Sequence, residues 1–152
     1  MELQTQRLKL IPCTAESIST ISIKGYEIGP HIKEYLKKLK DDSTLLGWGV
    51  WLVIEKENDS VIGDIGFKGK PDSENAVEVG YGILPSAQNK GYATEAVREI
   101  IKWAFTFENV TKVIAECRDD NGPSIRVLEK LNMNRIGSEN NMLKWELQKG
   151  HA

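Results

Sequence analysis

The chain has 152 residues, of which 40% are hydrophobic and 28% are charged, and its formal net charge is −2 with a pI near 5.8. This length allows a domain with its own core, and we expect residues 1–152 to form a single domain. Because a slightly acidic chain lacks the clustered cations that phosphate contacts need, nucleic acid is not an expected partner.

The sequence also argues against a membrane protein, a disulfide framework and a zinc site. The longest apolar run, 50–54, is too short to cross a bilayer, and the opening MELQTQRLKLIPC has no apolar signal segment. Cys13 and Cys117 stand alone, without the spacing of metal ligands. We therefore expect a cytoplasmic protein with reduced thiols, no metal and no membrane association.

The first forty residues predict one strand and two helices. Residues 7–11, RLKLI, alternate between apolar and polar, which indicates a strand. The stretch AESISTISI at 15–23 follows a threonine and is typical of a short capped helix. After a Gly-Pro pair, HIKEYLKKLK at 31–40 places its apolar side chains on one helical stripe.

Three strands are predicted next, at 48–56, 60–70 and 76–84. The first two are joined by the turn residues NDS, and both are rich in β-branched residues. In the third, AVEVGYGIL, the apolar side chains alternate with Glu78 and two glycines. This last strand therefore presents a nearly bare backbone on one face.

The second half predicts two helices and three strands. A helix begins at Tyr92, with apolar residues at helical spacing as far as Phe107, and KVIAEC at 112–117 is a short strand. Asn-Gly-Pro at 121–123 opens the second helix, and 134–147 holds two weak strands around a polar turn. This order predicts a mixed α/β domain with one central sheet flanked by helices.

The junction ILPSAQNKGYATEAV, where a strand gives way to a helix, is typical of an anion site. Backbone N–H groups at a helix start face the preceding turn, and the helix dipole favours negative charge there. A Walker loop does not fit, because Lys90 precedes Gly91 and no hydroxyl follows directly. A dinucleotide fingerprint does not fit either, because only one glycine is present and the unit lies mid-chain.

The spacing of QNKGYA resembles the Gln/Arg-x-x-Gly-x-Gly/Ala signature of the GNAT superfamily of acetyl-CoA-dependent N-acetyltransferases. The segments IGDIGFKG, VEVGYGIL and AECRDDNGPSIRVLEKLNM are similar to the branch that includes the ribosomal-protein N-terminal (RimJ/RimL-like) acetylases. The resemblance covers nearly the whole chain and is loosest over 15–48. It implies a GNAT-like fold that takes acetyl-CoA as cosubstrate.

The resemblance also implies which residues bind acetyl-CoA. The loop would wrap the pyrophosphate, and backbone N–H groups near the strand end would polarise the thioester carbonyl. The residues expected to bind the cosubstrate are Ile83, Leu84, Gln88, Asn89, Lys90, Gly91, Tyr92, Ala93, Thr94 and Asn121. The alternative is an ordinary strand-to-helix turn with a left-handed glycine.

Glu78 and Ser124 are the expected catalytic residues. Glu78 would remove a proton from the attacking amine, and the rival role is a surface carboxylate that balances a lysine. Ser124 would hydrogen-bond the departing thiolate, and the rival role is a hydroxyl at the helix start. Asn121 would contact the pantetheine arm, with a plain helix cap as its alternative.

The function expected from these features is transfer of an acetyl group from acetyl-CoA to a primary amine of a protein N-terminus or a small molecule. The alternative is a non-catalytic acyl-CoA-binding regulatory module. Asn132 and Met133 stand where the resembling branch has glycine and an aromatic residue. Asn tolerates a left-handed turn, but Met leaves the shape of the acceptor pocket open. The sequence also leaves the oligomeric state open.

Overall fold

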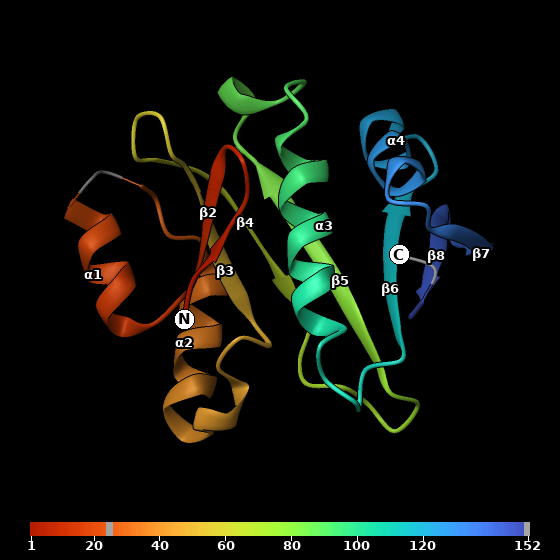
Figure 1. Cartoon of the computed structure of the whole chain (residues 1–152), viewed down its shortest axis with the longest axis horizontal. Helices are drawn as coiled ribbons and strands as arrows, with labels where there is room; N and C mark the ends of the chain where they lie inside the picture. Colours follow the sequence, from red (N-terminus) through yellow and green to blue (C-terminus); the bar gives the residue numbers. More distant parts are fainter. Residues whose placement is uncertain (24–25, 151–152) are drawn as a thin grey trace.

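Figure 1 shows the computed structural model of the chain, which describes residues 1–23 and 26–150. The expected domain over 1–152 also includes 24–25 and 151–152, which lie outside the described residues. The strands are β1 (Leu3–Gln4), β2 (Leu8–Pro12), β3 (Val50–Glu55), β4 (Ser60–Phe67), β5 (Ala76–Ile83), β6 (Lys112–Arg118), β7 (Asn134–Glu139) and β8 (Met142–Gln148).

The strands form one sheet in the order β1-β2-β3-β4-β5-β6-β8-β7. Neighbours are antiparallel except for the parallel pair β5 and β6. The helices are α1 (Ala15–Ile23), α2 (Pro30–Asp41), α3 (Tyr92–Ala104) and α4 (Gly122–Lys130), and two short 3-10 turns are η1 (Ser43–Leu45) and η2 (Pro85–Ala87). The predicted mixed α/β fold with a central sheet flanked by helices is confirmed.

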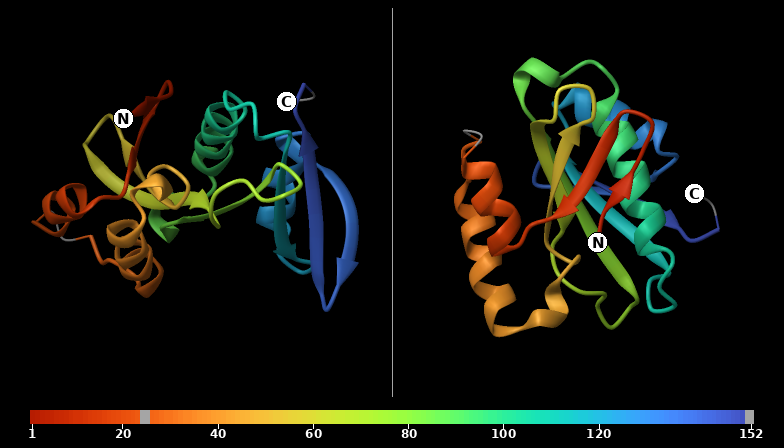
Figure 2. Two further views of the ribbon diagram at one scale, coloured as in Figure 1. Left: turned by 90° about the horizontal axis from the view of Figure 1, so that it is seen from below. Right: turned by 60° about the vertical axis from the view of Figure 1, so that its left-hand side comes forward.

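The helices cover the two faces of the sheet because the strands are apolar on both. One core cluster joins α3 and Leu128 of α4 to side chains of the central strands. A second cluster joins Ile18 of α1 and Ile32 and Tyr35 of α2 to Leu52 of β3. Figure 2 shows α3 on one side of the sheet and α1 and α2 on the other. No helix in residues 1–23 and 26–150 is both long and apolar enough to cross a membrane.

The structure differs from the sequence expectation at one additional strand and at the ends of several elements, of which the strand expected over 60–70 ends at Phe67. The two-residue strand β1 was not predicted, because two residues are too few to show alternation. Helix α3 ends at Ala104 and does not reach Phe107. The Phe107 ring instead packs edge-on against Trp48 and Trp103, with centroids 5.1 and 5.0 Å away. Phe107 is therefore apolar because it packs against other aromatic rings, and not because it belongs to the helix.

Strands β5 and β6 separate soon after they begin, and this separation positions the site. They pair only through Ala76–Glu78 and Lys112–Ile114, although β5 continues to Ile83 and β6 to Arg118. Figure 1 shows the two ribbons diverging toward their carboxyl ends, where α3 and α4 begin. The later part of β5 therefore has an unpaired edge inside the sheet.

Candidate active site

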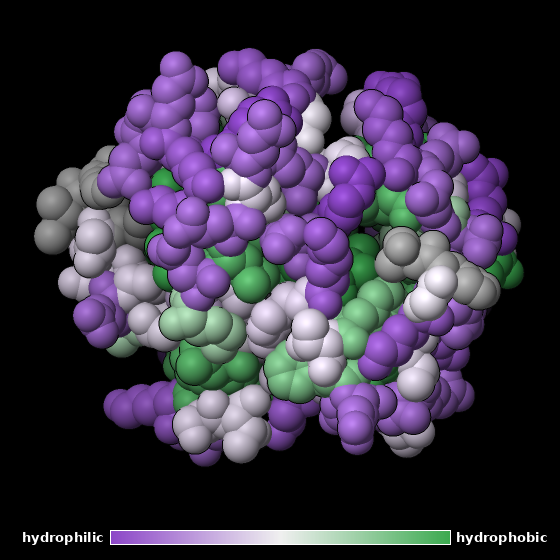
Figure 3. Space-filling model, viewed as in Figure 1, coloured by the Kyte–Doolittle hydropathy of each residue, from purple (hydrophilic) through white to green (hydrophobic). Residues whose placement is uncertain are grey.

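A cleft of about 480 Å³ lies where β5 and β6 have separated, between the end of β5 and the starts of α3 and α4. We name it the β5–α4 cleft. In Figure 3 a notch in the upper edge of the molecule, bordered mainly by hydrophilic residues, marks this region. The expected site residues that line it are Ile83, Gln88, Asn89, Gly91, Tyr92, Ala93, Thr94, Asn121 and Ser124. Leu84, Lys90 and Glu78 do not line it.

The loop before α3 has the geometry of an anion site. Asn89 and Gly91, on either side of Lys90, have left-handed φ values of 63° and 81°. Left-handed residues in such a turn gather backbone N–H groups into a concave nest. Gly91 is the N-cap of α3 and supplies no side-chain cap, so no side chain of the cap residue competes for the N–H groups of the first turn. Gln88 stabilises the loop by donating a hydrogen bond from Nε2 to the Ile83 carbonyl at 2.9 Å.

Arg7 and Glu95 fix this loop to the N-terminal part of the chain. Arg7 donates from Nη1 to the Lys90 carbonyl at 2.9 Å and from Nε to Glu95 Oε1 at 2.7 Å. Its guanidinium also lies 4.3 Å from the centre of the Tyr92 ring. Partial burial raises the pKa of Glu95, but hydrogen bonds from Thr5 and Arg7 outweigh this effect, so the net pKa is lowered. This network could not be predicted from the sequence, because Arg7 and Glu95 are 88 residues apart.

Every second residue of β5 hydrogen-bonds to β4, and this alternation determines which of its N–H groups face the cleft. Lys68 donates to the Glu78 carbonyl at 2.9 Å, and Leu84 donates to the Ile62 carbonyl at 2.8 Å. Antiparallel ladders alternate, so the N–H groups of Tyr81 and Ile83 point away from β4, toward the cleft. Of the two expected oxyanion donors, Ile83 therefore faces the cleft, and the N–H of Leu84 is already used by β4.

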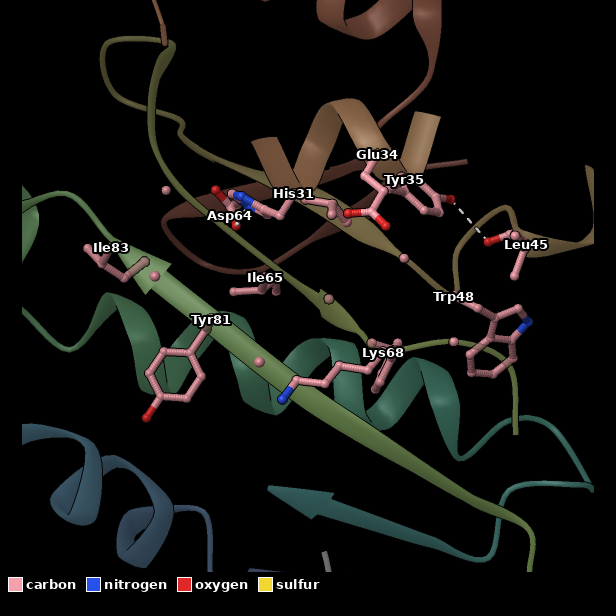
Figure 4. Close-up of a pocket in the computed structure, with 18 of the residues that line it drawn as sticks. His31, Glu34, Tyr35, Leu45, Trp48, Asp64, Ile65, Lys68, Tyr81 and Ile83 are labelled. Carbon is pink, nitrogen blue, oxygen red and sulfur yellow. Dashed lines mark hydrogen bonds and ion pairs between the residues drawn. The ribbon is translucent and has the colours of Figure 1, made fainter. Parts of the chain in front are cut away.

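Two hydroxyl groups approach each other across the β5–α4 cleft. Asn121 caps α4 by accepting from the Ser124 N–H at 3.2 Å, so the side chain of Asn121 supplies the helix cap. The Tyr81 hydroxyl is buried, and no group within the described residues meets it in hydrogen-bond geometry. Burial raises the pKa of Tyr81, and the nearby Ser124 hydroxyl offsets part of the rise. The sequence placed Tyr81 on an apolar face and could not show that its hydroxyl points toward α4 (Figure 4).

A larger cavity of about 770 Å³, which we name the α2 cavity, lies between α2 and the strands β4 and β5. It shares Tyr81, Gly82 and Ile83 with the β5–α4 cleft. A Cβ placed on Gly82 would meet no atom within 4 Å, so the backbone is bare at the shared point. The two cavities therefore meet across the end of one strand.

Asp64, Tyr26 and His31 form a polar group in the α2 cavity (Figure 4). The Tyr26 hydroxyl donates to Asp64 Oδ2 at 3.2 Å, and His31 Nε2 lies 3.1 Å from Asp64 Oδ1. Burial and then the Asp64 charge raise the pKa of Cys13 to about 12. The sequence did not single out Asp64, because a polar residue in an alternating strand is usually just solvent-facing.

Glu78, the expected base, forms an ion pair with Lys68 at 2.7 Å. Its side chain is 24% exposed, and it lies outside the linings of both cavities. Lys68 lies over β5, with its Cε 4.0 Å from the point that a Cβ on Gly80 would occupy (Figure 4). Within the described residues, no three His, Cys, Asp or Glu side chains gather in a way that could hold a metal ion.

The family is decided by comparison with known proteins. The profile of the acetyltransferase (GNAT) domain matches residues 26–134, well over half of the chain. The chain belongs to the GNAT family. An uncharacterized N-acetyltransferase of Bacillus subtilis (strain 168), YjdG, is 36% identical over 106 residues, which cover 70% of this chain and 61% of the relative. The chain spans about half to three-fifths of the length of several curated GNAT relatives that it matches.

Solved GNAT structures share the whole fold. Ribosomal-protein-S5-alanine acetyltransferase from Vibrio fischeri superposes with a TM-score of 0.78 at 16% identity, covering 97% of this chain and 96% of that one. RimL, a ribosomal L7/L12 alpha-N-protein acetyltransferase solved in complex with coenzyme A, gives 0.72 at 14% identity, covering 97% and 98%. At these identities the likeness concerns the fold.

Proposed function

We propose that this chain transfers an acetyl group from acetyl-CoA to a primary amine by direct attack, with residues 1–152 acting as one domain. The observation that carries the proposal is the meeting of the two cavities at Tyr81, Gly82 and Ile83. A cosubstrate in the β5–α4 cleft and an acceptor in the α2 cavity would contact each other only there. RimL, which has the same fold, was solved in complex with coenzyme A, and this supports acetyl-CoA as the cosubstrate.

The chain offers groups for each part of the reaction. The N–H groups of the loop and of the uncapped start of α3 would bind the pyrophosphate. The Ile83 N–H, which faces the cleft, would hydrogen-bond the thioester oxygen as negative charge develops on it. As the amine nitrogen bonds to the carbonyl carbon and the C–S bond breaks, the Ser124 and Tyr81 hydroxyls would stabilise the departing thiolate.

Glu78 is the proposed base. It lies on the same strand face as Gly82, four residues earlier and about 13 Å along β5, so water would relay the proton from the amine. The ion pair with Lys68 holds the carboxylate at this end of the strand. The amine would lose one proton toward Glu78, and the thiolate would gain one as coenzyme A leaves.

The test is thiol release from acetyl-CoA in the presence of mixed primary amines. Glu78→Gln keeps the shape but cannot accept a proton, so kcat should fall about 100-fold or more at neutral pH. The defect should shrink as pH rises and more amine is already neutral, whereas a loss that is equal at every pH would assign Glu78 to positioning. Coenzyme A binding without any thiol release would instead favour the non-catalytic acyl-CoA-binding module.

A further inference from the structure

The α2 cavity restricts which amine can be the acceptor, an inference that rests on the acetyl transfer proposed above. Asp64 of β4 is paired directly with Gly82 of β5. In the alternating antiparallel ladder this is one of the pairs whose backbones hydrogen-bond to each other, with Cα atoms about 5.5 Å apart. Since Gly82 also lines the β5–α4 cleft, Asp64 is a carboxylate next to the point where the acyl group would enter.

Asp64 is held in one orientation and keeps the capacity to bind a cation. Tyr26 and His31 contact one carboxylate oxygen each, at 3.2 and 3.1 Å. A carboxylate offers about four lone-pair sites, so two partners leave it able to accept further hydrogen bonds. The side chain is 20% exposed, which leaves a path for a ligand. Tyr26 and His31 are therefore positioning residues for Asp64.

The other carboxylates near the cavity are already paired with lysines. Glu34 of α2, which lines the cavity, lies 3.7 Å from Lys38, and Glu78 lies 2.7 Å from Lys68. Lys38 and Lys68 both line the cavity. A ligand with a second ammonium group would therefore meet cations beyond Asp64, with no unpaired carboxylate in the described lining to receive it.

The end of the cavity away from Asp64 is mostly apolar, with Lys68 at its margin (Figure 4). Its wall is formed by Tyr35, Leu45, Trp48 and Val50. Figure 4 shows Asp64 and His31 at one end and Leu45 and Trp48 at the other. A volume of about 770 Å³ is within the range of small-molecule sites, so an aromatic ring or an apolar side chain has room there.

We propose that the acceptor is a primary amine with one positive charge beside an apolar or aromatic group, bound with its ammonium on Asp64 and its apolar group toward Trp48. Two sources share this chemistry: a small arylalkylamine, and a peptide N-terminus whose first side chain is apolar. A polyamine does not fit, because its further charges would lie against lysines and apolar side chains.

The first experiment ranks acceptors with the unmodified protein. Thiol release from acetyl-CoA is measured with phenethylamine, ethanolamine, spermidine, and two short peptides that differ only in an N-terminal Phe or Ser. Phenethylamine should exceed ethanolamine and spermidine in kcat/KM by about tenfold or more, since burying an apolar group of this size contributes at least that much. Comparing kcat/KM for the Phe peptide with kcat/KM for phenethylamine shows whether the acceptor is a peptide N-terminus or a small arylalkylamine.

The second experiment uses Asp64→Asn, with Glu34→Gln as the matched control in the same cavity. Asp64→Asn should raise KM for phenethylamine about tenfold or more, as expected for a lost charged hydrogen bond, and change kcat less. The dissociation constant of coenzyme A should stay unchanged, which also shows that the variant is folded. Glu34→Gln should alter KM less than about twofold. Tyr26→Phe should give a smaller rise in KM without a fall in kcat.

The outcomes separate the two proposals. If no amine releases thiol, the proposed acetyl transfer fails, and this inference fails with it. If spermidine or ethanolamine is preferred over phenethylamine, or if Asp64→Asn and Glu34→Gln behave alike, the acceptor inference is overturned while acetyl transfer stands. Preference for phenethylamine or the Phe peptide, lost on Asp64→Asn, supports it.

Discussion

The two cavities that meet at the end of β5 are built from different parts of the chain. The β5–α4 cleft presents mostly backbone groups: the nest around Lys90, the start of α3 and the cleft-facing N–H of Ile83. The α2 cavity presents side chains, with Asp64 held by Tyr26 and His31 at one end. Backbone groups do not depend on residue type, so a site made of them suits a ligand that all members of a family share. A site made of side chains can differ between members that take different acceptors.

This comparison predicts that the cleft is most sensitive where backbone conformation is special. Gly91 has φ 81°, a conformation that costs most other residues about 1–2 kcal/mol. Asp tolerates this conformation better than most residues, so Gly91→Asp acts mainly through the negative charge that it adds beside the proposed pyrophosphate position. The dissociation constant of coenzyme A should rise about 100-fold or more.

The matched control for Gly91→Asp is Gly91→Asn, which has the same size and the same tolerance of the left-handed conformation but adds no charge. Its loss of affinity should stay within about tenfold. Calorimetry on both folded variants measures the effect. Unchanged affinity of Gly91→Asp would remove the loop from the cosubstrate site.

The loop of the cleft nevertheless depends on one side-chain network, the hydrogen bonds between Arg7 and Glu95. Glu95→Gln removes the charge that holds Arg7, so the free energy of unfolding should fall by about 1–3 kcal/mol at neutral pH. The folded-state pKa of Glu95 is lowered, so its contribution is complete above its ordinary value of 4.5 and is lost as pH falls through the lowered value.

Urea unfolding at neutral and at acidic pH checks this prediction for Glu95. The difference between wild type and Glu95→Gln should shrink below the ordinary pKa of the carboxyl. Glu99→Gln, one turn later in α3 and 3.8 Å from exposed Lys102, is the control and should cost less than about 1 kcal/mol. A difference that persists equally at acidic pH would contradict the role of the charge.

The smallest expected effects concern the two hydroxyls at the junction. Ser124→Ala and Tyr81→Phe should each slow single-turnover acetyl transfer about two- to tenfold, as expected for one lost neutral hydrogen bond. Stability should not fall with the rate, since Asn121 supplies the cap of α4 and the Tyr81 hydroxyl has no partner to lose within the described residues.

Melting temperature and single-turnover rate are measured on the same preparation of each hydroxyl variant. A destabilised but fully active Ser124→Ala would return Ser124 to a structural role. A fully active Tyr81→Phe with raised stability would show that the buried hydroxyl only costs free energy.

The sequence predicted the parts of the molecule that depend on short-range order. Alternation predicted the central strands, and the change from alternating to helical spacing predicted the junction between β5 and α3. The role of Gln88 to Thr94 in cosubstrate binding stays a prediction. The link between Arg7 and Glu95 was not predictable, because only the packing of α3 against the turn between β1 and β2 brings these distant residues together. Asp64 was missed because alternation shows a polar strand residue without showing its partners, which come from α2 and from the segment before it.

The early separation of β5 from β6 leaves an open strand edge in the interior of a sheet. Exposed edges are templates on which strands of other chains can add and start aggregation. Here the edge at Tyr81 and Ile83 is recessed between the starts of α3 and α4, which also line the β5–α4 cleft. A strand of another chain would have to lie alongside several residues of β5 to pair with it, and α3 and α4 occupy the space that it would need. The fold thus leaves the unpaired N–H groups of β5 accessible to a narrow ligand and inaccessible to the strands of other proteins.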